Sequence, residues 1–172
     1  MARRQAQRAP GGGRLGHAIA VRGAVDRAGG AAEADRSGDG VSVRFAGYAA
    51  VFGKPDRGGD MIRPGAFAES LARGNAVPLL WQHKAGAVIG RVEHLSEDRR
   101  GLRVIAELGT GEEARRAASL LASGKLDGLS FGYRVREAGR RGDLRELIDL
   151  DLIEVSLVAE PMQPKARVHA VE

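Results

Sequence analysis

Short apolar runs separated by turn-forming residues fill the sequence from Val41 onward, and this pattern constrains the fold more than any other feature. Strand character is predicted at residues 41–52, 76–83, 87–95, 102–108, 129–136, 144–149 and 152–158, with an edge strand at 166–168. The glycine-bounded turn at 139–142 predicts a hairpin. Six or seven strands with two helical segments predict an α+β fold, in which a mainly antiparallel sheet can close into a barrel.

The two helix predictions depend on start and stop signals. The first helix is expected to begin near Pro64 and to end at Gly74, which can adopt the left-handed conformation that closes a helix. The second is expected to begin at Thr110, whose hydroxyl can cap the helix while Glu113 reaches back to complete a capping box. Gly124 is expected to end it.

Residues 1–40 differ from the rest of the sequence in composition. They are mostly Ala, Arg, Gly and Asp, so they bury too little apolar surface to offset the entropy lost on ordering. Five of the chain's 27 basic residues and none of its 22 acidic residues lie within positions 1–22, so the remaining chain is balanced at 22 of each. We therefore expect a flexible basic N-terminal arm at 1–40 and one neutral folded domain at 41–172.

Composition excludes several classes of protein. The chain has no cysteine, which rules out a disulfide scaffold, a cysteine nucleophile and a thiolate zinc site. No apolar run is long enough to span a bilayer, and the N-terminus lacks the apolar stretch of a secretion signal, so a soluble intracellular protein is predicted. A neutral body and an aromatic content of 4% disfavour nucleic-acid binding, leaving the basic arm as the only candidate contact for nucleic acid or an acidic partner.

His83 is the first candidate for chemistry. It follows Leu79, Leu80 and Trp81, the only tryptophan, and a Lys-Ala-Gly turn comes directly after it. A histidine fixed by an apolar strand, with its ring at the surface, is a candidate general base because imidazole exchanges protons near neutral pH. The alternative is that His83 only hydrogen-bonds nearby backbone.

Ser130 and Glu154 are candidate partners of His83, because each is a polar residue within an apolar strand-like run. A carboxylate at Glu154, between Ile153 and Val155, is costly to bury unless it is paired, and His83 would be a suitable partner. Ser130 becomes a nucleophile if a histidine removes its proton and a third polar group holds the imidazole. Spacing alone leaves this triad open, because any serine in a β domain can be given such partners.

Metal and phosphate sites are not supported by the sequence. Gly11-Gly12-Gly13 lacks the preceding strand and following helix of a phosphate-binding loop, and the four histidines are too scattered for metal-ligand spacing. Asp149 and Asp151 alternate with leucines, as on a solvated strand face, so a metal site that they would form with Glu154 is disfavoured. We expect neither a metal nor a cofactor.

Six segments together resemble the prohead proteases of tailed bacteriophages in their order and spacing, over roughly residues 41–170. These segments are Gly47-Tyr48-Ala49-Ala50-Val51-Phe52, Ile62-Arg63-Pro64-Gly65-Ala66-Phe67, Leu80-Trp81-Gln82-His83, Ile89-Gly90-Arg91-Val92, Leu129-Ser130-Phe131-Gly132-Tyr133 and Glu154-Val155-Ser156-Leu157-Val158. The resemblance implies a serine endopeptidase with a fold related to that of the herpesvirus assembly protease (assemblin), a small β-barrel flanked by helices. By the family's pattern Ser130 matches the nucleophile, His83 the base and Glu154 the third member of the triad.

The resemblance also implies a biological setting. Such enzymes act inside the immature capsid, or prohead, in the cytoplasm of the bacterial host, where they cut the scaffolding segment from the major capsid protein. That protein and its scaffolding segment are the expected partners, with the portal as a further candidate and an oligomer expected inside the prohead. The home of the gene is expected to be a phage, a prophage or a gene transfer particle. The alternative is a non-enzymatic capsid-assembly or scaffold-like protein that keeps the fold.

This sequence departs from the family's pattern at its C-terminal end. Pro161-Met162-Gln163-Pro164 stands where the family usually has Pro-Ala-Asn-Pro, so the turn is expected but its side-chain contacts are not. The chain also stops soon after this turn, whereas many relatives carry a longer extension, which argues against self-removal of a C-terminal scaffold segment.

Overall fold

The computed structural model describes residues 42–172, which form eight strands and two helices. The elements are β1 (Arg44–Val51), β2 (Asp60–Ile62), α1 (Ala68–Ala72), β3 (Pro78–Trp81), β4 (Val88–Glu97), β5 (Gly101–Leu108), α2 (Glu112–Ala122), β6 (Gly128–Arg141), β7 (Leu144–Val158) and β8 (Val168–Val171). The predicted basic arm lies outside the described residues. Within them, no helix has the length and apolar character needed to cross a membrane.

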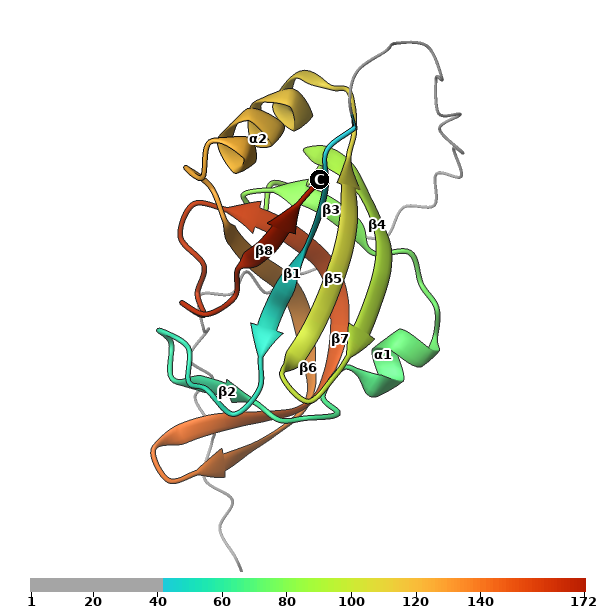
Figure 1. Cartoon of the computed structure of the whole chain (residues 1–172). Coiled ribbons are helices and arrows are strands. Elements are labelled where there is room, and N and C mark those ends of the chain that lie inside the picture. Colours follow the sequence, from blue (N-terminus) through green and yellow to red (C-terminus); the bar gives the residue numbers. More distant parts are fainter. Residues whose placement is uncertain (1–41) are drawn as a thin grey trace, which may run out of the picture.

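All eight strands belong to one sheet, in the order β2-β7-β3-β4-β5-β1-β8, with β6 paired to β7. Figure 1 shows the sheet curling, so that β6 and β7 cross behind β1 and β5 while α2 covers one end and α1 lies beside β4. Most pairs are antiparallel, as predicted, but β2 and β3 both run parallel to β7. The curl brings the start of β6 beside the segment that leads into β8. There Leu129 N–H donates to Ala166 O at 3.0 Å. The predicted α+β fold with a barrel-like sheet is confirmed.

A single hydrophobic core fills the inside of the curled sheet. Its largest fully buried side chains are Phe45, Phe67, Leu79, Ile89, Leu102, Val104, Leu129, Leu147, Leu150, Val155 and Leu157. Burying each of these residues contributes roughly 1.5–3 kcal/mol. Six of these residues come from β3, β6 and β7, the strands that carry or border the predicted site residues, so the core fixes that part of the backbone.

Both helices were predicted, but the predicted start of each helix is wrong. α2 begins at Glu112 with Gly111 at the N-cap and no side-chain capping bond, so the Thr110 capping box is wrong. α1 begins only at Ala68, because Gly65 adopts a φ of +90° and interrupts helical geometry just after Pro64. The helix ends were correct, since Gly74 and Gly124 take φ values of +64° and +66°.

The strand predictions were correct in position and wrong in several lengths. The two runs at 144–149 and 152–158 form one continuous strand, β7, and its hairpin with β6 turns at Gly142, whose φ is +65°. β2 was not predicted, and its three residues pair with β7. In β1 the register shifts between Ala46 and Gly47 toward β8 and between Tyr48 and Ala50 toward β5.

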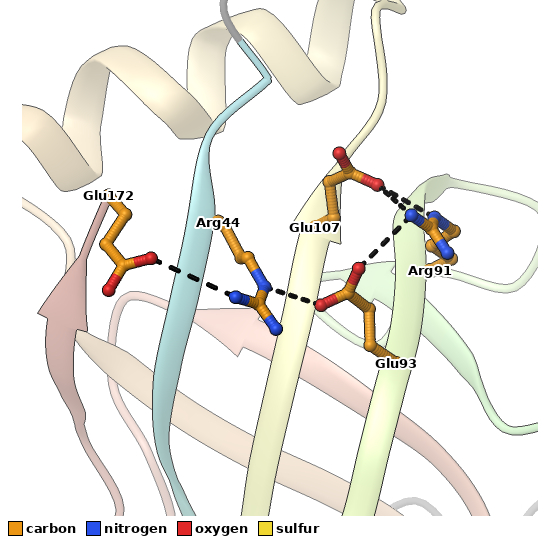
Figure 2. Close-up of polar contacts among 5 residues, drawn as sticks. All are labelled: Arg44, Arg91, Glu93, Glu107 and Glu172. Atoms are coloured by element: carbon orange, nitrogen blue, oxygen red, sulfur yellow. Dashed lines mark hydrogen bonds and ion pairs between the residues drawn. The ribbon is translucent and has the colours of Figure 1, made fainter.

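An alternating row of charges crosses the outer face of β8, β1, β5 and β4 (Figure 2). Arg44 lies between Glu172 at 3.9 Å and Glu93 at 2.6 Å, and Arg91 contacts both Glu93 at 3.1 Å and Glu107 at 2.5 Å. We call these five residues the charge ladder. Their charges are largely paired with one another, and four strands are tied together at the surface.

Candidate active site

His83 lies on a left-handed turn directly after β3. Gln82 and His83 have φ values of 51° and 58°, a conformation that costs a residue other than glycine about 1–3 kcal/mol. The turn is held because Gln82 N–H donates to Leu157 O at 3.0 Å and Lys84 N–H donates to Trp81 O at 2.9 Å. The strand therefore ends two residues earlier than predicted, and the strained turn sets the direction of the imidazole.

The imidazole of His83 meets the carboxylate of Glu154. His83 Nδ1 and Glu154 Oε1 are 2.6 Å apart, and the Glu154 side chain is 7% exposed while that of His83 is 23% exposed. Since a carboxylate can only accept a hydrogen bond, Nδ1 carries the proton and Nε2 is the nitrogen left to receive another. The pairing of His83 with Glu154 that the sequence suggested is present.

Gly132 makes room for this carboxylate. Gly132 lies opposite Glu154 in the β6–β7 pair, and a Cβ atom placed on it would come within 2.6 Å of Glu154 Oε1 and 2.9 Å of its Cγ. Real Cβ contacts are not this short, so any side chain at position 132 would displace the carboxylate. Gly132 therefore leaves the space that the Glu154 carboxylate occupies.

Ser156 binds the other oxygen of the carboxylate. Its hydroxyl donates to Glu154 Oε2 at 2.6 Å and accepts the backbone N–H of His83 at 3.2 Å. Ser156 falls within one of the six matched sequence segments and had no predicted role. A signal was available, because residues two apart in a strand share a face, which places Ser156 beside Glu154.

Ser130 joins this group through strand register. It pairs directly with Ser156 across β6 and β7, so the two side chains lie on the same face with their Cβ atoms about 4.5–5.5 Å apart. Ser130 is 7% exposed and Ser156 is 0% exposed. Within residues 42–172, no hydrogen bond joins Ser130 to His83, and such bonds often tighten only when substrate binds.

Asp149 and Asp151, the acidic residues of the disfavoured metal site, contact arginine side chains. Asp151 accepts hydrogen bonds from Arg73 and, at 3.2 Å, from Arg136, and Asp149 lies 3.5 Å from the same Arg136. Their side chains are directed to arginines near the surface, whereas Glu154 is directed to His83. Of these three carboxylates, only Glu154 contacts His83.

A second buried carboxylate, Asp60, lies on β2. It accepts the hydroxyl of Tyr133 at 3.2 Å and an N–H of Arg145 at 3.4 Å. Burial raises the pKa of Asp60 above its ordinary value, and nearby Asp56 raises it further, while Arg145 opposes the shift. Burial also raises the pKa of Tyr133, so its phenol stays protonated and donates. This cluster is separate from the His83–Glu154 pair.

The fold matches that of herpesvirus proteases. The structure of KSHV protease in complex with a hexapeptide phosphonate inhibitor superposes with a TM-score of 0.55 and 15% identity, over 76% of this chain and 65% of that one. The varicella-zoster virus protease superposes with a TM-score of 0.51 and 17% identity, over 76% of this chain and 64% of that one. At this identity the matches define the class of fold, a herpesvirus-protease-like curled sheet.

Sequence similarity identifies the family of the chain. It belongs to the caudovirus prohead serine protease family, which it matches over residues 31–172. It is 38% identical over 104 residues to the prohead protease of Enterobacteria phage HK97, a match that covers 58% of this chain and 45% of that protein. The chain thus spans less than half the length of that relative and just under two thirds of the two herpesvirus proteases.

Proposed function

We propose that this chain is a serine endopeptidase of phage or phage-like capsid maturation. Ser130 is the nucleophile, His83 the general base and Glu154 the residue that orients and stabilises the imidazole. The observation that carries the proposal is the 2.6 Å contact between His83 Nδ1 and buried Glu154, formed on the strand whose neighbour presents Ser130. Family membership supports the serine-protease class of this proposal.

The proposed reaction follows from the protonation states. Ser130 Oγ attacks the carbonyl carbon of the scissile peptide bond, and its proton passes to Nε2 of His83. The imidazolium is stabilised by Glu154 through Nδ1–H. When the tetrahedral intermediate collapses, the C–N bond breaks and His83 returns the proton to the leaving amine. Water, deprotonated by His83, then hydrolyses the ester on Ser130.

The proposed substrate is the scaffolding segment of the major capsid protein. Cleavage would take place inside the prohead, in the cytoplasm of the bacterial host, with the enzyme present as an oligomer and the portal as a further partner. Support comes from the HK97 relative, which is a prohead protease, and from the family description. The competing function is a non-enzymatic capsid-assembly or scaffold-like protein, which has no need for a serine and a carboxylate on one face of the β6–β7 pair with a histidine bonded to that carboxylate.

Co-expression with the major capsid protein from the same genome tests the proposal. We expect a new N-terminus on the capsid protein by mass spectrometry with the wild-type chain and none with Ser130→Ala. Ser123→Ala is the matched control, because Ser123 is an exposed serine on α2 whose hydroxyl only contacts backbone carbonyls of its own helix. Normal processing by Ser130→Ala would overturn the proposed nucleophile, and an uncut capsid protein beside folded wild-type chain would favour the scaffold alternative.

A further inference from the structure

The hydroxyl of Ser156 connects both halves of the acid–base pair. It donates its proton to Glu154 Oε2 at 2.6 Å, and its oxygen accepts the backbone N–H of His83 at 3.2 Å. A serine hydroxyl has one donor and two acceptor sites, so a single group can make both bonds at once. Ser156 therefore touches the carboxylate directly and the histidine through its strained backbone.

The carboxylate needs this contact to keep its orientation. Glu154 is 5% exposed, and its Oε1 accepts from His83 Nδ1 while Oε2 accepts from Ser156. The terminal torsion of a glutamate is broad, so one hydrogen bond alone leaves the carboxylate free to rotate. Two bonds to different oxygens fix its plane, and Gly132 leaves the space in which that plane lies.

Ser156 faces Ser130 across the strand pair, yet the two serines are not equivalent. Ser156 is fully buried and its proton is already donated to Glu154, whereas Ser130 keeps 7% of its exposure. Of the two serines, only Ser130 retains any exposed surface. Ser130 is therefore the proposed nucleophile of the two, and the hydroxyl of Ser156 is engaged with Glu154.

We propose that Ser156 is a positioning residue of the active site, which holds the Glu154 carboxylate and the His83 turn in the geometry needed to activate Ser130. The inference rests on the proposed function, since it assumes that His83 and Glu154 act on Ser130. Ser156 acts through these residues without touching substrate. Its loss should therefore lower the rate of the chemical step and leave substrate affinity nearly unchanged.

The test measures how fast Ser130 is phosphonylated by an alkyl fluorophosphonate, whose P–F bond breaks as the serine oxygen bonds to phosphorus, using the full chain. Ser156→Ala should lower the maximal inactivation rate about ten- to a hundredfold, a range typical when a group that orients a site residue is removed. The concentration for half-maximal rate should change less than about twofold. Ser156→Cys serves as a second variant, because it nearly keeps the side-chain volume and is a much weaker donor. It should fall in the same range.

Ser70→Ala is the matched control. Ser70 Oγ accepts the backbone N–H of Leu152 on the same strand at 2.9 Å, so this variant removes a hydroxyl that supports β7 without touching Glu154. It should react at the wild-type rate. If Ser156→Ala and Ser156→Cys also react at that rate, the inference is wrong.

Coupling to Glu154 separates positioning from general structural support. In a Glu154→Ala background, adding Ser156→Ala should cause a much smaller further loss than in the wild type, because one of the two groups that Ser156 holds is already gone. A full ten- to hundredfold further loss would show that Ser156 acts independently of Glu154 and would overturn the inference. The low-field proton NMR signal of His83 Nδ1–H should also shift or broaden in Ser156→Ala and stay unchanged in Ser70→Ala.

Failure of the proposed function is distinguishable from failure of this inference. If Ser130→Ala is still modified by the fluorophosphonate at the wild-type rate, the proposed nucleophile is wrong and Ser156 positions nothing for it. If Ser130→Ala is inert but Ser156→Ala reacts like wild type, the proposed function stands and only the role of Ser156 fails.

Discussion

The charge ladder and the contact between His83 and Glu154 both join acidic to basic side chains, and the two regions differ in burial and in geometry. In the charge ladder, Glu93 lies between Arg44 and Arg91, whose side chains are 50% and 68% exposed. On β7, Glu154 is 5% exposed, and its two oxygens have separate partners, His83 from the turn after β3 and Ser156 from β7 itself. Exposed pairs contribute little because water screens them, whereas a buried carboxylate must be fully bonded. We therefore expect the charge ladder to contribute little to stability, and we propose the buried pair as the place where chemistry occurs.

The largest effect should come from removing the nucleophile and its base. Ser130→Ala and His83→Ala should each lower the rate of peptide cleavage by about 10⁴-fold or more, and the double variant should be no slower than the worse single one. The reason is that base and nucleophile act as one unit. The rates are measured on processing of the capsid protein by quantitative mass spectrometry. A double variant whose loss equals the product of the two single losses would mean that the residues act independently.

Glu154→Gln should give the next largest effect. The amide can still orient the His83 ring but cannot match its charge after proton transfer, so turnover should fall by roughly ten- to ten-thousandfold while the fold persists. The same assay measures it, with circular dichroism as the check on folding. Wild-type turnover in this variant, with the loss reproduced by a substitution of Asp151 or His94, would show that the third residue was named wrongly.

Gly132→Ala should disturb the site without removing any functional group. The new Cβ would lie 2.6 Å from Glu154 Oε1, so the carboxylate must move away from His83. A displacement of about 1 Å can cost about a hundredfold in rate. Gly139→Ala is a control on the same strand, since its Cβ would meet only the end of the Ile148 side chain at 3.3 Å. Equal rates for both variants would show that Gly132 is not needed for the carboxylate.

Asp60→Asn should change how stability depends on pH. Because the folded-state pKa of Asp60 is raised above 3.8, ionising this group costs more in the folded state than in the unfolded state. Wild-type stability from this group is therefore greatest below that ordinary value and is lost as pH rises through the folded pKa. Asp60→Asn has no such loss. Its free energy of unfolding minus that of the wild type should therefore increase as pH rises. Parallel urea denaturation series measure the difference, and a constant difference across pH would exclude the effect.

Glu93→Gln should have the smallest effect. It removes the charge shared by Arg44 and Arg91, yet exposed pairs are worth about 0.2–1 kcal/mol each and are screened by salt. Urea denaturation at low salt should show a loss of about 1 kcal/mol, which shrinks at high salt. Peptide cleavage should be unchanged. A loss of cleavage in this variant would remove the distinction between the two regions.

Much of the fold was readable from the sequence because local patterns set it. Alternating apolar runs gave the strands, and the glycines that adopt positive φ gave the ends of α1 and α2. The sequence could not reveal that β2 and β3 pair in parallel with β7, since parallel pairing joins segments far apart in the chain. It also gave no signal for the N-cap of α2, where Gly111 is used in place of Thr110.

The site was only partly readable for a similar reason. His83, Ser130 and Glu154 could be proposed because each is a polar residue beside apolar neighbours, and the structure brings His83 into contact with Glu154. The left-handed turn at Gln82 and His83 could not be predicted, because such a conformation is unfavourable locally and is held by contacts with β7. Ser156 was readable from its spacing to Glu154, but its importance appears only in its two hydrogen bonds.

The central claim is that the buried pair of His83 and Glu154 activates Ser130. The most direct measurement is to treat the full chain with an alkyl fluorophosphonate and to locate the modified residue by peptide mass spectrometry. A single adduct on Ser130, absent in His83→Ala, is the predicted result. An adduct on another serine, or equal modification of Ser130 in wild type and His83→Ala, would contradict the claim.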